Sequence, residues 1–301
     1  MRHALPRRRA RITLLPSALS AGARESPTPI ALLSGPWCTA AALDGRLRLS
    51  AALAAHGFSV CLADLPGYGR AQGLPRDWGV DEVVEDLHGA LTGALRHPTP
   101  CVIAHSASAV LMQHYLESFP LAALVMLAPL PPSGLGASLQ RWLGGSERAA
   151  PLDVGSVAAA LRRVAGTPQA ARMELLAGAR TPEEALEACM ADAEEVCLVD
   201  GGAAEESSLC GVDAAAQLLL GLAESRVSLE PQPVPMCIVA PGSEAMLTES
   251  EASATAELHG LCVEDGSVLP AGALGHACMY GEEADVAGVR DGVVRWVAER
   301  F

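Results

Sequence analysis

The chain has 301 residues, half of them hydrophobic, which is long enough for one large α/β domain with a sizeable core. Its formal net charge of −14 at pH 7 gives no electrostatic attraction for nucleic acid or for an anionic membrane surface. All 21 basic residues are arginines, which excludes chemistry that needs a lysine, such as a Walker A site or a Schiff base to pyridoxal phosphate.

The start of the chain differs in composition from the rest. Residues 1–24 contain six arginines and no acid, whereas residues 25–301 contain 15 arginines and all 35 acids. Such a leader is typical of a mitochondrial or chloroplast transit peptide, and a disordered start or a misplaced gene start would give the same pattern. We therefore interpret residues 1–28 as a disordered leader or possible transit peptide and residues 29–301 as the folded domain. Without a transit peptide the expected location is the cytoplasm.

From residue 29 onward, short apolar runs alternate with longer helix-like segments. The runs are bounded by turn residues, as expected for buried parallel strands, and they cover residues 29–33, 58–63, 100–104 and 124–128. The spacing of apolar residues predicts helices between them, at residues 43–56, 78–96 and 107–118. This alternation predicts a mostly parallel sheet with helices on both faces.

The alternation stops between about residues 132 and 230. This region has little strand signal and several helix-like stretches, and the clearest helix start is Thr181 followed by Pro182. Strand signal returns at residues 236–240 and more weakly at 261–264, and an amphipathic segment at 286–300 predicts a last helix. We therefore expect one α/β domain with an inserted helical lid at about residues 132–230.

The sharpest local motif is Ala104-His105-Ser106-Ala107-Ser108, between a predicted buried strand and a predicted helix. A serine on such a tight turn is exposed at the carboxyl edge of the sheet, where the N–H of Ala107 can stabilise an oxyanion. The glycines of the G-x-S-x-G pattern are replaced here by Ala104 and Ser108, which are still small enough for the turn. We expect His105, and His114 on the following helix, to be packing or surface residues.

A nucleophilic serine needs a general base, and the base needs an acid that orients it. His276 lies in a glycine-flanked loop before the last predicted helix, and Glu244 follows the strand at 236–240. The chain order Ser106, Glu244, His276 is the order found in α/β-hydrolases. Glu249 and Glu251 are alternative candidates for the acid.

Six segments in this order make the chain resemble an α/β-hydrolase of the esterase and lysophospholipase-like branch with a helical lid. They are PIALLSGPW, ADLPGYG, VIAHSASAVLMQHYLE, LVMLAPLPPSG, VPMCIVAPGSEAMLT and LGHACM, within residues 29–301. The resemblance implies an α/β-hydrolase fold, a serine nucleophile at Ser106, a Ser-His-Glu triad and no cofactor. The lid sequence is only loosely similar and does not indicate the substrate.

The oxyanion segment departs from the family pattern. The resemblance implies one donor from Ala107 and a second from the segment Ser34-Gly35-Pro36-Trp37, but Pro36 has no N–H to donate. The N–H of Trp37 or the hydroxyl of Ser34 are the available substitutes. Loss of one oxyanion donor lowers turnover by roughly 10²–10³-fold.

These observations predict a serine hydrolase that cleaves a carboxylic ester, small or lipid-like. The altered oxyanion segment leaves open a catalytically impaired protein that binds a ligand or a partner, and lyase or acyl-transfer chemistry on the same fold. The nine cysteines form no C-x-x-C pair and no zinc-site spacing, so we expect no metal and a reducing compartment. The longest apolar stretch, residues 121–130, is too short for a membrane helix, so we expect a soluble protein.

Overall fold

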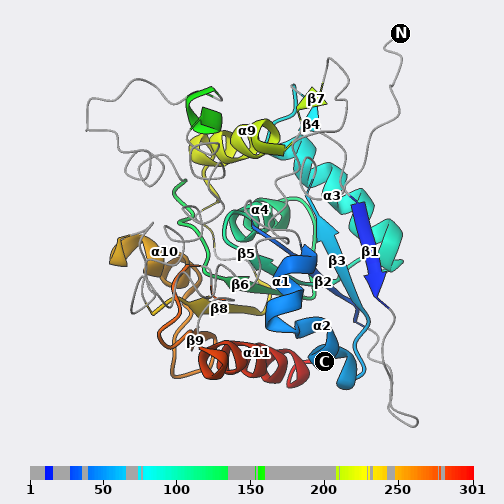
Figure 1. Ribbon diagram of the computed structural model, residues 1–301, viewed down its shortest axis with the longest axis vertical. Coiled ribbons are helices and arrows are strands. Elements are labelled where there is room, and N and C mark those ends of the chain that lie inside the picture. Colours follow the sequence, from blue (N-terminus) through cyan, green and yellow to red (C-terminus); the bar gives the residue numbers. More distant parts are fainter. Residues whose placement is uncertain are drawn as a thin grey trace.

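A computed structural model describes most of the predicted domain (Figure 1). The described residues are 11–15 (as backbone), 28–35, 40–65, 74–75, 77–134, 153, 155–159, 208–209, 211–228, 230, 233–242, 248–276, 278 and 282–301. The main sheet has seven strands: β1 (Arg11–Leu15), β2 (Ile30–Leu33), β3 (Val60–Asp64), β5 (Cys101–His105), β6 (Ala123–Leu127), β8 (Met236–Ala240) and β9 (Val268–Pro270). Their order across the sheet is β1-β3-β2-β5-β6-β8-β9.

All neighbouring strands of this sheet are parallel except β1, which runs antiparallel to β3 at one edge. The carboxyl ends of the six parallel strands therefore meet at one edge of the sheet. Loops that leave these ends can bring distant parts of the chain together, as is usual for ligand sites in α/β folds. The prediction of a mostly parallel sheet is confirmed.

Helices cover both faces of the sheet, as predicted. One face carries α1 (Ala40–Leu47), α2 (Leu49–Ala55) and α11 (Glu283–Ala298), and the other carries α3 (Val80–Leu95), α4 (Ala107–Leu116) and α9 (Gly211–Glu224) (Figure 1). Successive residues of a strand alternate between the two cores: Ile30 and Leu32 pack on the first side, and Ala31 and Leu33 on the second. This double burial explains why the strands are continuously apolar.

The predicted insertion lies between two neighbouring strands. The chain leaves the sheet after β6 and returns at β8, which pairs with β6 in parallel. The described part of this insertion holds α9, the helical residues 155–159 and a short strand, β7 (Ser208–Leu209), which pairs with β4 (Leu74–Pro75). The expected helix that starts at Thr181 lies outside the described residues, and the role of the insertion as a lid stays a prediction.

Two predicted elements differ from the structure. The single helix expected at 43–56 is two helices, α1 and α2, because Arg48 between them adopts the left-handed conformation with φ 54°. Asp44 stabilises the break: its carboxylate accepts a hydrogen bond of 2.7 Å from the N–H of Ser50, in the first turn of α2.

The prediction of a weak strand at 261–264 is also wrong. Residues 263–266 form a turn instead, in which Gly266 has φ 73° and Asp265 accepts a hydrogen bond of 2.8 Å from the N–H of Ser267. An Asp-Gly pair favours such a turn, because the aspartate bonds to the following backbone and the glycine takes a positive φ without strain. The strand forms after the turn, as β9.

The edge strand β1 lies inside the predicted leader. Arg11 pairs with Asp64 and Leu15 with Val60, in antiparallel register. We expected no strand in this part of the chain, because its many arginines and its lack of acids indicated a leader. The interpretation of residues 1–28 as a leader stays a prediction.

Within the described parts of the chain, no helix is both long and apolar enough to cross a bilayer.

Candidate active site

Ser106 occupies a strained turn between β5 and α4. Its backbone has φ 59° and ψ −124°, a conformation that residues other than glycine rarely adopt. Its N–H donates to the carbonyl oxygen of Leu127 at the end of β6, at 2.9 Å. Strain of this kind is typical of the serine in a nucleophile elbow, where the turn projects the hydroxyl at the carboxyl edge of the sheet.

Small side chains on both sides of the serine allow this turn. Ala104 is fully buried in β5, and Ser108 is buried in the first turn of α4. The Ser108 hydroxyl also donates a hydrogen bond to the main-chain carbonyl of Ser34, after β2. The residue in place of the second glycine thus connects α4 to the predicted oxyanion segment.

His276 lies directly against the serine. Its Nε2 is 2.8 Å from Oγ of Ser106, although the two residues are 170 positions apart in the chain. Both side chains are about 1% exposed. An imidazole nitrogen that accepts a hydrogen bond from a serine hydroxyl is placed to remove its proton, which is the geometry of a nucleophile and its general base.

The predicted acid, Glu244, lies outside the described residues, but the chain leading to it is anchored beside the histidine loop. The N–H of Gly242 donates to the carbonyl oxygen of Leu274 at 2.9 Å. A Cβ atom on Gly242 would lie 1.7 Å from the carbonyl oxygen of Gly272, so only glycine fits there. Glu244 is two residues after Gly242, and His276 is two residues after Leu274.

The two alternative acids lie in the first turn of one helix. Glu251 caps α10 (Glu249–His259): its carboxylate accepts a hydrogen bond of 2.8 Å from the N–H of Thr248, and the Thr248 hydroxyl accepts one from the N–H of Glu251. This reciprocal arrangement is a capping box, which stabilises the helix start. Glu249 is exposed in the first turn of the same helix.

The first predicted oxyanion donor, Ala107, lies at the start of α4, directly after Ser106. Ala107 is the first residue of α4, and the first N–H groups of a helix have no acceptor within it. The helix start also favours negative charge. Trp37, the second predicted donor, and Pro36 lie outside the described residues. Gly35 before them lies very close to the elbow, since a Cβ atom on it would be 2.9 Å from Cβ of Ser106.

His105 was expected to be a packing or surface residue, and it is buried, as a packing residue would be. The prediction did not include a contact to the site, but Nε2 of His105 lies 3.0 Å from the main-chain oxygen of His276. Its position before the serine, at the carboxyl end of a buried strand, was the signal that it lies at the functional edge. His114, by contrast, packs away from the serine, with its Nε2 2.9 Å from Oγ of Ser225 in the segment after α9.

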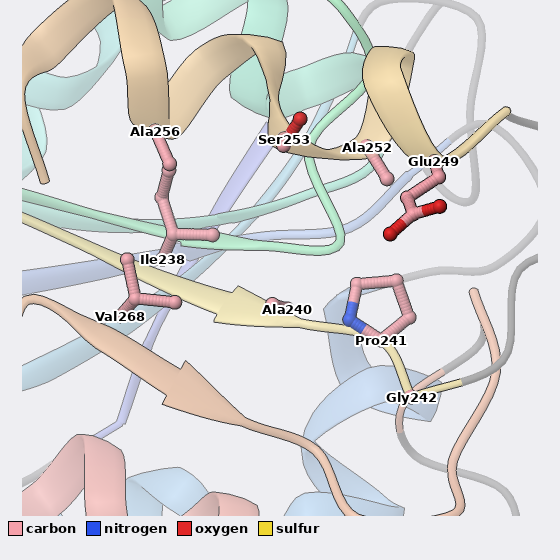
Figure 2. Close-up of a pocket in the computed structure, with 9 residues that line it drawn as sticks. All are labelled: Ile238, Ala240, Pro241, Gly242, Glu249, Ala252, Ser253, Ala256 and Val268. Carbon is pink, nitrogen blue, oxygen red and sulfur yellow. The ribbon is translucent and has the colours of Figure 1, made fainter. Parts of the chain in front are cut away.

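A separate pocket of about 460 Å³ lies between α10 and the sheet (Figure 2). Ala256 extends from α10 towards Ile238 and Val268 at one end of the pocket, and Ala252 and Glu249 lie above Pro241 at the other end. Neither Ser106 nor His276 is among its lining residues.

Among the residues that the structure describes, no three His, Cys, Asp or Glu side chains gather closely enough to hold a metal ion.

Solved structures with the same overall arrangement cover almost the whole chain. A thermophilic esterase from Thermogutta terrifontis has 16% sequence identity and a TM-score of 0.63, over 97% of this chain and 94% of that one. A proline iminopeptidase-related protein from Thermus thermophilus has 23% identity and a TM-score of 0.63, over 97% and 100%. A bromoperoxidase from Bacillus anthracis has 15% identity and a TM-score of 0.63, over 91% and 92%.

At these sequence identities the similarity shows the fold alone, and the names of the three proteins refer to different activities. No curated protein matches the chain in sequence. The sequence model of the alpha/beta hydrolase family, however, matches residues 30–288, from the first parallel strand into the last helix. That match spans most of the sequence, and the sheet order and the turn at Ser106 agree with it. The chain therefore belongs to the alpha/beta hydrolase family.

Proposed function

We propose that this protein is a serine hydrolase that cleaves a carboxylic ester through Ser106, His276 and Glu244. The observation that carries the proposal is the distance of 2.8 Å between Oγ of Ser106 and Nε2 of His276. A buried serine and histidine meet in this way, at a strained strand-to-helix turn, when the serine acts as a nucleophile.

In the proposed reaction, Oγ of Ser106 attacks the ester carbonyl carbon while Nε2 of His276 takes the hydroxyl proton. The negative charge that develops on the carbonyl oxygen is stabilised by the N–H of Ala107 and the start of α4, with the N–H of Trp37 as the second proposed donor. Collapse of the tetrahedral intermediate breaks the bond to the leaving alkoxide, which receives the proton from His276. A water molecule, deprotonated by His276, then attacks the acyl carbon. The bond from that carbon to Oγ of Ser106 breaks, Oγ takes the proton back from His276, and the acyl group leaves as a carboxylic acid.

Glu244 is the proposed acid that accepts the Nδ1 proton of His276 and holds the ring in the tautomer needed for catalysis. Two contacts of the neighbouring chain support this role: the hydrogen bond from Gly242 to Leu274, and the close packing of Gly242 on Gly272. They hold Gly242, two residues before Glu244 in the chain, against the loop that carries His276. The capping bond of Glu251 further favours Glu244 over that competitor.

The substrate class is proposed only broadly, as a small or lipid-like ester. The insertion between β6 and β8 is rich in apolar residues, and α9 within it packs against the same core as α4, the helix that follows Ser106. An insertion placed over the carboxyl edge as a lid would favour an apolar acyl or alkyl group. The oxyanion segment with Pro36 is the feature that favours the second candidate, a catalytically impaired protein that binds a ligand.

Fluorophosphonate labelling of the full chain tests the proposal. A probe of this type forms a covalent bond to an activated serine with loss of fluoride, so the wild type should be labelled on the Ser106 peptide. Labelling should be absent in Ser106→Ala and strongly reduced in His276→Ala. Ser118→Ala, which changes an exposed serine at the end of α4, is the matched control and should be labelled like the wild type. A folded wild type without labelling would exclude the hydrolase and favour the ligand-binding candidate.

Hydrolysis and acyl transfer are separated by their products. With a p-nitrophenyl ester, a hydrolase releases the free acid at the same rate whether or not an alcohol or amine acceptor is present. Acyl transfer would instead give the acylated acceptor in proportion to the acceptor concentration.

A further inference from the structure

His105, directly before the nucleophile, lies between two segments of the candidate active site. Its side chain is 3% exposed, and its Nε2 is 3.0 Å from the main-chain oxygen of His276. A carbonyl oxygen only accepts hydrogen bonds, so Nε2 of His105 must carry the hydrogen. This bond fixes one ring nitrogen of His105 as a donor towards the histidine loop.

The opposite edge of the same ring faces the oxyanion segment. A Cβ atom on Gly35 would lie 2.8 Å from Nδ1 of His105 and 3.3 Å from its main-chain oxygen. The His105 ring also lies beside the ring of His276, with centroids 5.7 Å apart and planes inclined by 52°. The imidazole therefore fills the space between the chain after β2 and the loop after β9.

The main chain before His276 is held at several described points, the first of them the bond of 2.9 Å from the N–H of Ala271 to the carbonyl oxygen of Ala240. Closer to the histidine, the N–H of Leu274 donates to the carbonyl oxygen of Ala271 at 3.1 Å, and the carbonyl oxygen of Leu274 accepts from the N–H of Gly242 at 2.9 Å. These three bonds act on residues before His276. The bond from His105 acts on the His276 peptide itself, and it comes from the residue next to Ser106. It therefore links the main chain of the base to the main chain of the nucleophile.

We propose that His105 is a positioning residue: its Nε2–H holds the main chain of His276 so that the His276 imidazole stays within hydrogen-bonding distance of Ser106. The inference rests on the proposed function, since it concerns the same nucleophile and base. Displacement of a reacting group by about 1 Å can lower a rate by about 10²-fold, so one hydrogen bond at this place has a large expected effect.

Two variants separate the hydrogen bond from the volume of the ring. His105→Leu removes the donor and keeps a side chain of similar size, whereas His105→Gln offers an amide N–H in place of Nε2–H. The rate constant of fluorophosphonate labelling should fall about 10- to 100-fold in His105→Leu and should stay within about threefold of the wild type in His105→Gln. With a p-nitrophenyl ester, kcat should fall in His105→Leu with little change in KM, because the proposed role concerns the base.

His114→Leu is the matched control, since His114 is a second buried histidine with a hydrogen bond away from the serine. It should lower the melting temperature and leave the labelling rate of the folded protein unchanged. A folded His105→Leu that is labelled as fast as the wild type would overturn the proposal. The same conclusion would follow if His105→Gln were as slow as His105→Leu.

An NMR measurement keeps this inference separate from the hydrolase assignment. The imidazole ¹⁵N signals of the full chain, assigned with His105→Leu and His276→Ala, report tautomer and hydrogen bonding without any turnover. We expect a hydrogen on Nε2 of His105 and a shift of the His276 signals in His105→Leu but not in His114→Leu. Unchanged His276 signals would overturn the positioning role, whereas absent labelling with the expected NMR shifts would contradict only the hydrolase.

Discussion

Gly35 approaches Ser106 so closely that a Cβ atom on the glycine would lie 2.9 Å from Cβ of the serine. The same Cβ would be 2.8 Å from Nδ1 of His105. Real side-chain contacts are longer than this, so the chain after β2 can lie this close to the turn at Ser106 only with glycine at this position.

Gly35→Ala should therefore disturb the site directly. We expect a labelling rate at least about tenfold below the wild type, because the new methyl group must displace His105 or Ser106. The overpacking should also lower the free energy of unfolding by about 1–3 kcal/mol. Fluorophosphonate labelling and urea unfolding of the same sample measure the two effects.

Gly93→Ala is the matched control for this substitution. A Cβ atom on Gly93, in the exposed face of α3, would meet nothing within 4 Å. This variant should be labelled like the wild type and be more stable by about 0.5–1 kcal/mol, since alanine favours a helix over glycine. Normal labelling of Gly35→Ala would show that the oxyanion segment does not have to lie against the elbow.

Glu244→Gln tests the proposed acid. Loss of the carboxylate leaves the wrong tautomer of His276 favoured, so kcat for a p-nitrophenyl ester should fall by on the order of 10²–10⁴. Glu251→Gln should keep the wild-type kcat, because its side chain bonds to the start of α10. It should lose about 0.3–1 kcal/mol of stability, since glutamine keeps the acceptor oxygen of the capping box but not the negative charge that the helix start favours. A Glu244→Gln variant of normal activity beside an inactive Glu249→Gln would assign the acid to Glu249.

The stability of the fold should decrease at mildly acidic pH. Burial lowers the pKa of His259 and of His88 below the ordinary value for histidine. In the unfolded chain these groups take up protons at higher pH than in the folded one, so their contribution to stability is complete above about pH 6.5 and is lost as the pH falls below that value. Urea unfolding at pH 7.5, 6.5 and 5.5 should show a decreasing free energy of unfolding.

The double substitution of His88 and His259 by Gln should reduce this pH dependence. Nε2 of His259 lies 3.3 Å from Oε1 of Gln113, and Nδ1 of His88 lies 2.8 Å from the Tyr115 hydroxyl. His56→Gln, at an exposed position, is the control and should keep the wild-type slope. If the double substitution leaves the pH dependence of the free energy of unfolding unchanged, titratable groups other than these two histidines cause it.

The buried cysteines should resist alkylation in the folded protein. Burial raises the pKa of Cys61, Cys101 and Cys237 to about 12, so at pH 8 roughly 10⁻⁴ of each thiol is ionised. Cys262 is exposed in the segment after α10. Iodoacetamide followed by peptide mapping should find Cys262 modified and the three buried thiols unmodified until urea is added. Early modification of Cys61 or Cys101 would mean that the sheet opens locally under native conditions.

Much of the fold could be predicted from local patterns. The strand at residues 236–240 was predicted with its observed bounds, and β5 and β6 differ from their predicted ranges by one residue at each end. A continuous apolar run of this length is typical of a parallel strand that is buried on both faces. It can therefore be recognised without knowledge of the strands that pair with it. The helix break at Arg48 was missed because it depends on the contact between Asp44 and Ser50 rather than on apolar spacing.

By itself, the sequence determined most of the parallel strands, most of the helices between them and the turn at Ser106, since these follow from residue size, apolar spacing and backbone preferences within a few positions. Only the tertiary structure brought Nε2 of His276 to 2.8 Å from Oγ of Ser106 and made His105 a neighbour of the His276 main chain. Those contacts join residues about 170 positions apart. They form because the parallel strands end at one edge of the sheet, where loops from distant parts of the chain meet. A hydrogen bond depends on the distance between atoms of two such loops, and the residue pattern within one loop does not determine that distance.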